Sequence, residues 1–146
     1  MSPEEQLQVI EALAGTIKGS TADVRKEAFH CLIELGLDGL SRIIDVVDDP
    51  DATDECRKEA VEALGTAFSQ GKVDKTGMIR HAIRALESCL TKDPTVCEAA
   101  VVAIGDIGTE AISAKPKLLA LLDGKKDNSR ICVKTAAALL KVSPVH

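Results

Sequence analysis

Four stretches of the chain repeat one spacing of apolar and polar positions. They cover residues 24–36, 56–68, 96–108 and 131–143. In each stretch the first, fifth, eighth, ninth and twelfth positions carry an aliphatic or small side chain. Because an α-helix turns once in about 3.6 residues, these positions fall on one face of a helix. The pattern predicts four similar helices, each of which buries one stripe of side chains.

The residues around these stretches predict where the helices begin and end. A residue suited to capping stands three positions before each stretch, with a side-chain oxygen that accepts amide hydrogens of the first turn. Pro94 takes a first helical position, where its missing N–H is not needed. Gly36 and Gly108 end two stretches, as a left-handed terminal residue requires. The expected caps are Thr21, Thr53, Asp93 and Asn128.

A second set of amphipathic segments provides partner helices for the first set. They cover residues 2–19, 37–49, 76–90 and 115–124. The first of them opens with Ser2, Pro3 and Glu5, which predict a capping box with proline in the first turn. The four stretches start 32, 40 and 35 residues apart, a period typical of helical solenoids. We predict one all-α domain over residues 1–146, made of four helix pairs: 1–36, 37–71, 72–110 and 111–146.

The repeated stretches resemble a known family. "ADVRKEAFHCLIELG", "ECRKEAVEALG" and "DPTVCEAAVVAIGDIG" are similar to the HEAT-like repeat first named from phycobilisome lyases. The resemblance implies a right-handed α-α superhelix of the HEAT or armadillo type, with the second helices lining its concave side. Two features depart from the family pattern. Cys97 and Cys132 stand where Arg25 and Arg57 stand in earlier copies, and the fourth copy lacks both glycines.

The superhelix that the resemblance implies favours a binding function. A helix pair cannot hide its apolar face alone, so stacked pairs form an extended surface suited to holding a partner. We predict a non-catalytic module or scaffold that binds another protein along the second helices. A phycobilin-lyase-type subunit and a weak nucleic-acid binder are alternatives, and ordinary variation of a solvated surface explains the same positions. The candidate contact residues are Lys26, His30, Lys58, Glu62, Glu98, Val102, Val133 and Ala137.

Little in the sequence indicates catalysis or a metal. His30, His81 and His146 lie on different predicted elements, and no phosphate loop or hydrolase motif is present. The acidic stretch 45–55 lacks the spacing of a calcium loop, and a helix end followed by a turn and a helix start explains it. The five cysteines are an odd number without a C-x-x-C pair. We therefore predict no enzymatic activity, no metal and no cofactor.

Charge and composition add three expectations. Phe29 and Phe68 are the only aromatic residues, so the core must consist of aliphatic side chains. The amino terminus is acidic and no apolar run is long enough to span a bilayer, which favours a cytoplasmic protein without membrane contact. Residues 1–70 carry a net charge of −9 and residues 115–146 carry +5. This asymmetry, together with a last helix that is apolar on more than one side, predicts self-association or further repeats at the carboxyl end.

Overall fold

A computed structural model describes residues 1–71 and 77–145. Within these ranges every regular element is a helix, which confirms the predicted all-α fold. The predicted repeat boundary at residue 72 and His146 lie outside the described residues. The elements are α1 Pro3–Ile17, α2 Ala22–Glu34, α3 Leu37–Asp48, α4 Asp54–Ser69, α5 Gly77–Ser88, η1 Cys89–Thr91, α6 Pro94–Ile107, η2 Gly108–Ala114, α7 Lys115–Gly124 and α8 Ser129–Val142.

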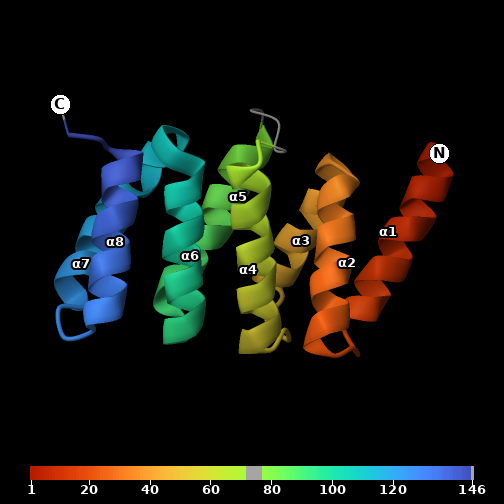
Figure 1. Ribbon diagram of the computed structural model, residues 1–146, viewed down its shortest axis with the longest axis horizontal. Coiled ribbons are helices and arrows are strands. Elements are labelled where there is room, and N and C mark those ends of the chain that lie inside the picture. Colours follow the sequence, from red (N-terminus) through yellow and green to blue (C-terminus); the bar gives the residue numbers. More distant parts are fainter. Residues whose placement is uncertain (72–76, 146) are drawn as a thin grey trace.

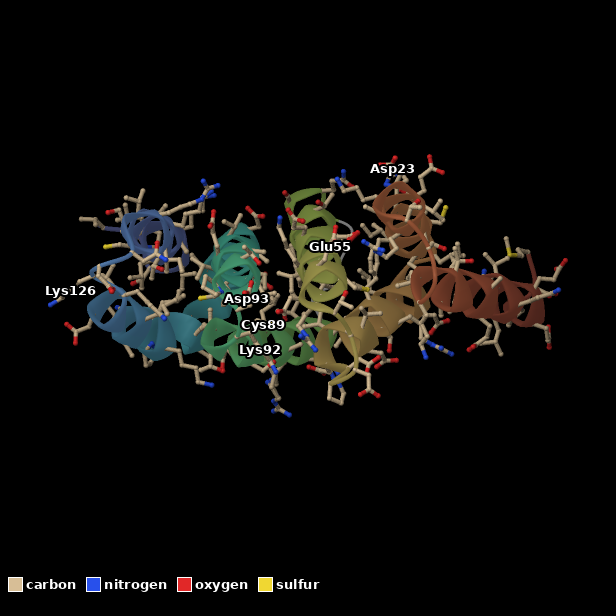
Figure 2. All side chains as sticks on the ribbon, turned by 90° about the horizontal axis from the view of Figure 1, so that it is seen from below. Asp23, Glu55, Cys89, Lys92, Asp93 and Lys126 are labelled. Atoms are coloured by element: carbon tan, nitrogen blue, oxygen red, sulfur yellow. The ribbon has the colours of Figure 1, made fainter. Side chains whose placement is uncertain are left out.

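The helices form a two-layered solenoid (Figure 1). Helices α2, α4, α6 and α8 make up one layer, and α1, α3, α5 and α7 make up the other, as Figure 2 shows along the stack. The two chain ends lie at opposite ends of the stack. In the layer of α2, α4, α6 and α8, helix α4 packs directly on α6 and α6 on α8, whereas the helices of the other layer approach one another less closely. The second helices are therefore the more tightly packed layer.

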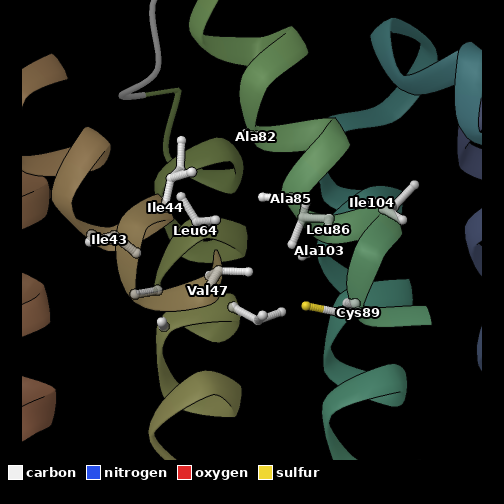
Figure 3. Packing of buried hydrophobic residues seen from close by; sticks show 14 of the residues in the cluster. Ile43, Ile44, Val47, Leu64, Ala82, Ala85, Leu86, Cys89, Ala103 and Ile104 are labelled. Carbon is white, nitrogen blue, oxygen red and sulfur yellow. The ribbon is translucent and has the colours of Figure 1, made fainter. Parts of the chain in front are cut away.

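The core is a continuous row of aliphatic side chains between the two layers. Val47, Leu64, Leu86 and Cys89 are among the buried side chains that meet between α3, α4, α5 and η1 (Figure 3). Fully burying one such aliphatic side chain stabilises a fold by about 1.5–3 kcal/mol. Because each helix pair contributes only part of this row, the repeats depend on their neighbours for stability.

Most of the predicted helix ends are confirmed. The Ser2 side chain accepts from the Glu5 amide while Glu5 bonds back to the Ser2 amide, which completes the predicted capping box. Thr53, Asp93 and Asn128 each cap their helix through a side-chain oxygen. Thr21 makes no side-chain cap, although its backbone is extended as a cap requires, and nothing in the structure explains the difference.

Two predicted helix ends have a glycine with the expected positive φ, although the ψ values of −144° and −142° are not those of a left-handed helical residue. Gly36 and Gly108 have φ values of 74° and 79°, which a residue with a side chain rarely adopts. Gly36 also stands at the start of α3, so α2 and α3 are joined by a very short turn. After Gly108 the chain forms the 3₁₀ segment η2 before α7 begins, rather than entering the last helix pair directly.

Glycine at one repeat position sets the spacing of the second helices. A Cβ on Gly65 would lie 3.3 Å from the Cβ of Ala103, and one on Gly105 would lie 3.2 Å from the Cα of Ala138. These contacts let α4, α6 and α8 pack closely. The corresponding residue of α2 is Ile33, which is buried. Helix α2, which carries this larger side chain, packs less closely on α4 than α4 packs on α6.

The arginines of the repeat motif are structural. Arg57 is 5% exposed and donates to the backbone carbonyls of Val47 and Asp49, at the end of α3. Arg25 reaches across to the next repeat, where it donates to the Glu59 carboxylate at 2.7 and 3.0 Å. One arginine therefore ties the helices of a repeat together, and the other ties two repeats.

The ends of the stack depart from the predicted stripe. Val24 and Cys31 occupy the first and eighth repeat positions of α2, yet both are exposed. Leu7 of α1, about one turn before the buried Ile10, is 54% exposed. The equivalent stripe residues of α4 and α6 pack between two neighbouring repeats. In residues 1–71 and 77–145 no further helix packs against the outer side of α1 and α2, and the side chains there are therefore exposed.

Candidate partner-binding face

The solvent side of α2, α4, α6 and α8 is called the second-helix face from here on. Six of the eight predicted contact residues line two grooves on this face. Lys26, His30 and Glu62 line the first groove, and Glu62 also lines the second with three others, Lys58, Glu98 and Val102. Val133 and Ala137 line neither groove; both are exposed on α8.

The first groove lies between α2 and α4, where Ile33 replaces glycine. It has a volume of about 260 Å³. Phe29, Ile33 and Ala63 form its apolar part, while Lys26 and Glu62 bring charge to it. The groove exists because α2 and α4 approach each other less closely than α4 and α6 do. It can accommodate one or two small side chains of a partner.

The second groove is wider and crosses from α4 over α6 to α8. It has a volume of about 660 Å³, with Ala99, Val102 and Ala103 as its apolar part. Its other side chains come largely from repeat positions that the sequence analysis did not select. Of these missed side chains, all but Ser69 stand just before the first position or at the fourth or eleventh position, and this regular spacing could have identified them; Ser69 follows the end of its stretch. The missed residues include Thr66, Ser69, Thr95, Asp106, Arg130 and Lys134.

Two carboxylates of the second groove are neutralised within the protein. Glu98 accepts from Arg130 at 2.6 Å and lies 3.8 Å from Lys134. The hydrogen bond to Glu98 raises the pKa of the Arg130 guanidinium. Burial raises the pKa of the Asp106 carboxyl, and Lys141 at 3.8 Å partly offsets this effect. These pairs join α6 to α8 and leave little net charge at that end of the groove.

Three other charges on the face have no such compensation. Lys26, Lys58 and Glu62 make no ion pair with another residue in the described part of the chain, and Lys26 and Glu62 are exposed. An unpaired charge beside an apolar groove is free to pair with a partner. The second-helix face therefore has two cations and one carboxylate beside the apolar side chains of the two grooves.

The side chains that could take part in catalysis or bind a metal are dispersed over the structure. His30 lies on α2 and His81 on α5, in different layers. Burial raises the pKa values of the Cys89 and Cys97 thiols, which keeps both protonated and unreactive near neutral pH. Across residues 1–71 and 77–145, there is no group of three or more His, Cys, Asp and Glu side chains that could hold a metal ion.

In the same ranges, no helix combines the length and apolarity that crossing a bilayer requires.

The acidic stretch 45–55 has the predicted local structure. It forms the end of α3, a turn in which the Asp51 amide donates to the Asp49 carboxylate, and the start of α4. Together with α1 it lines a groove of about 920 Å³ on the side of Arg25 and Arg42. Carboxylates at the start of α4 are favoured by the helix dipole.

Comparisons with known proteins find one distant relative by sequence. The chain is 32% identical over 72 residues to deoxyhypusine hydroxylase from Phaeosphaeria nodorum. The match covers 49% of this chain and 22% of that relative, so the chain spans about a fifth of the relative's length. No protein-family model matches the chain.

This relative corrects one prediction. We expected a protein without enzymatic activity, and that prediction is wrong because the named relative is an enzyme. The sequence argument depended on missing catalytic motifs. Such short motifs identify only some classes of enzyme, because catalytic groups are more often brought together by the fold than by adjacency in the chain.

A comparison of structures identifies the fold. An engineered protein, a structural genomics target with a crystal structure, superposes with a TM-score of 0.62 at 23% identity. The superposition covers 91% of this chain and 62% of the engineered protein. The chain is thus an all-helical solenoid that is similar over 72 residues to deoxyhypusine hydroxylase.

Proposed function

We propose that the protein binds a partner protein on the second-helix face. This proposal rests on the two grooves. In them the unpaired charges of Lys26, Lys58 and Glu62 lie beside apolar side chains. Structural ion pairs elsewhere on the face are already satisfied. A repeat scaffold needs its stripe residues for stacking, whereas these three charges contribute nothing to stacking and remain for recognition.

The charges specify the kind of partner. Glu98 and Asp106 are neutralised by Arg130, Lys134 and Lys141, so the free charge near the centre of the face comes from Lys26 and Lys58. A complementary segment carries acidic side chains that reach Lys26 on α2 and Lys58 on α4, followed along the stack by an apolar residue. The apolar residue docks against Val102 and its neighbours in the second groove, and a basic side chain of the segment faces Glu62.

Charge reversal tests this proposal. The double substitution Lys26→Glu and Lys58→Glu is expected to lower recovery of the partner in affinity purification from the source lysate by about tenfold. Replacing two attractions by repulsions at a groove costs roughly 1–2 kcal/mol of binding free energy. The readout is the quantity of each co-purified protein by mass spectrometry.

A matched control changes the same charge on the other layer. Arg80 and Lys92 are both exposed, Arg80 on α5 and Lys92 just after η1 on the opposite side of the molecule (Figure 2). Their replacement by glutamate should leave recovery within about twofold. Equal loss in both double variants would mean that net charge, not the second-helix face, controls binding. Unchanged recovery with the Lys26 and Lys58 variant would exclude this face.

A second candidate function follows from the named relative. The 32% identity over 72 residues supports a role in hydroxylating a substrate that contains deoxyhypusine. In this candidate the second-helix face holds the substrate protein. The solenoid would then itself act as a hydroxylase rather than as a scaffold alone.

A direct assay tests the second candidate. The purified chain is incubated in air with a deoxyhypusine-containing protein, a reductant and first-row transition metals added in turn. The expected product has gained one oxygen atom on the deoxyhypusine residue, as measured by mass spectrometry of its peptides. Samples without the chain are the control. Substrate that stays unmodified under every condition would rule this candidate out.

A further inference from the structure

The carboxyl-terminal end of the solenoid presents an unpartnered apolar surface. Val133 and Leu140 on α8 are 68% and 58% exposed. They occupy the third and tenth repeat positions. In α6 these positions are Glu98 and Gly105, which contact α8: Glu98 bonds to Arg130, and Gly105 packs on Ala138. Val133 and Leu140 thus occupy the positions through which a repeat contacts its successor. We call these two residues the tail face.

The amino-terminal end presents the complementary half of the same contact. Val24 and Cys31 occupy the first and eighth positions of α2. In α6 and α8 the eighth position is Ala103 and Ala138, both buried against the glycine of the preceding repeat. In α2 the equivalent residues are exposed. We call Val24 and Cys31, with Asp23 and Glu27 beside them, the head face.

The charges of the two ends are opposite. Residues 1–70 carry −9 and residues 115–146 carry +5. Asp23 lies at one end of the stack and Lys126 at the other, and both adjoin a loop at the same edge of the solenoid (Figures 1 and 2). A second copy would therefore approach with its acidic amino-terminal end toward the basic carboxyl-terminal end of the first. Opposite charges at such a contact speed association and fix the register.

We propose that the tail face binds the head face of a second copy, so that the solenoid continues head to tail. The contact reuses the packing already seen from α4 to α6 and from α6 to α8. Leu140 stands where Ile33 stands in α2, so the spacing should match the wider α2–α4 junction rather than the glycine-mediated ones. A head-to-tail contact is heterologous, and it produces open chains or a ring rather than a closed dimer.

Sedimentation velocity under reducing conditions measures the association. The average mass should rise with concentration from about 5 to about 500 µM and pass that of a dimer. Because opposite charges contribute, about 0.5 M salt should shift the association to higher concentration. A single monomeric species over the whole range would overturn the proposal and assign the tail face to some other occupant.

Two variants and their mixture test the polarity of the contact. The tail variant carries Val133→Glu and Leu140→Glu, and the head variant carries Val24→Arg and Cys31→Arg. All four positions are exposed, so each variant should fold, which circular dichroism checks. Each variant alone should be monomeric, since it keeps only one intact face. An equimolar mixture should form a one-to-one dimer that grows no further.

The mixture also separates this arrangement from a symmetric one. If two tail faces bound each other, the head variant alone would still form dimers. That result would overturn the head-to-tail proposal, as would a mixture that stays monomeric. Neither result depends on the second-helix face, because Lys26 and Lys58 are unchanged in all of these proteins.

Discussion

Gly39→Ala is expected to lower the free energy of unfolding by about 3 kcal/mol or more. Gly39 lies in the first turn of α3, directly against the end of α2. A Cβ at this position would be 1.8 Å from the carbonyl oxygen of Leu32 and 2.7 Å from its carbonyl carbon. Both are backbone atoms that cannot rotate away, so α2 and α3 would have to move apart. For a chain of this size the melting temperature should fall by about 10 °C.

The matched control is Gly15→Ala in α1. A Cβ at Gly15 would meet no atom within 4 Å. Alanine is a better helix former than glycine, so this substitution should stabilise the protein by about 0.5–1 kcal/mol. Urea unfolding followed by circular dichroism measures both variants, since the chain has no tryptophan or tyrosine for fluorescence. A Gly39→Ala protein as stable as the original would contradict the close contact between α2 and α3.

Arg57→Ala should lower the free energy of unfolding by about 3 kcal/mol. The guanidinium is buried and donates at 3.1 Å to the Val47 carbonyl and at 2.5 Å to the Asp49 carbonyl. It also lies 3.5 Å from the carboxylate of Asp54 at the start of α4. Alanine would leave both carbonyls without this charged donor and open a cavity between α3 and α4.

Arg42→Ala is the control for loss of an arginine ion pair. Arg42 of α3 pairs with Glu11 of α1, and both side chains are substantially exposed. A pair of this kind usually contributes less than about 1 kcal/mol, because water and salt screen it. If Arg42→Ala and Arg57→Ala destabilised the protein equally, the buried contacts of Arg57 would not be the source of its effect. The same urea titration compares the two.

The sequence predicted the elements well because their signals are local. The apolar stripes at helical spacing identified α2, α4, α6 and α8, and capping residues placed most of their starts. Ser2 and Glu5 bond to each other across a single turn, so a short sequence pattern was enough to predict that contact. The period of the stretches predicted a solenoid, since helix pairs with one apolar side have few other ways to hide it.

The site was predicted only in part. Lys26, His30, Lys58 and Glu62 were expected on the second-helix face, and the structure places them there beside the two grooves. Arg130, Lys134 and Asp106 were missed because the sequence alone does not show that neighbouring helices bring them to the same groove. Whether any of these residues binds a partner stays a prediction.

By itself the sequence determined the helices and most of their starts, because these depend on residues within one or two turns of one another. Only the tertiary structure decided which repeat positions lie at a junction and which at an open end. Val24 and Ile131 hold the same repeat position, yet Val24 is 45% exposed and Ile131 only 2%. The difference arises because burial depends on a neighbouring helix, which a repeat pattern alone does not place.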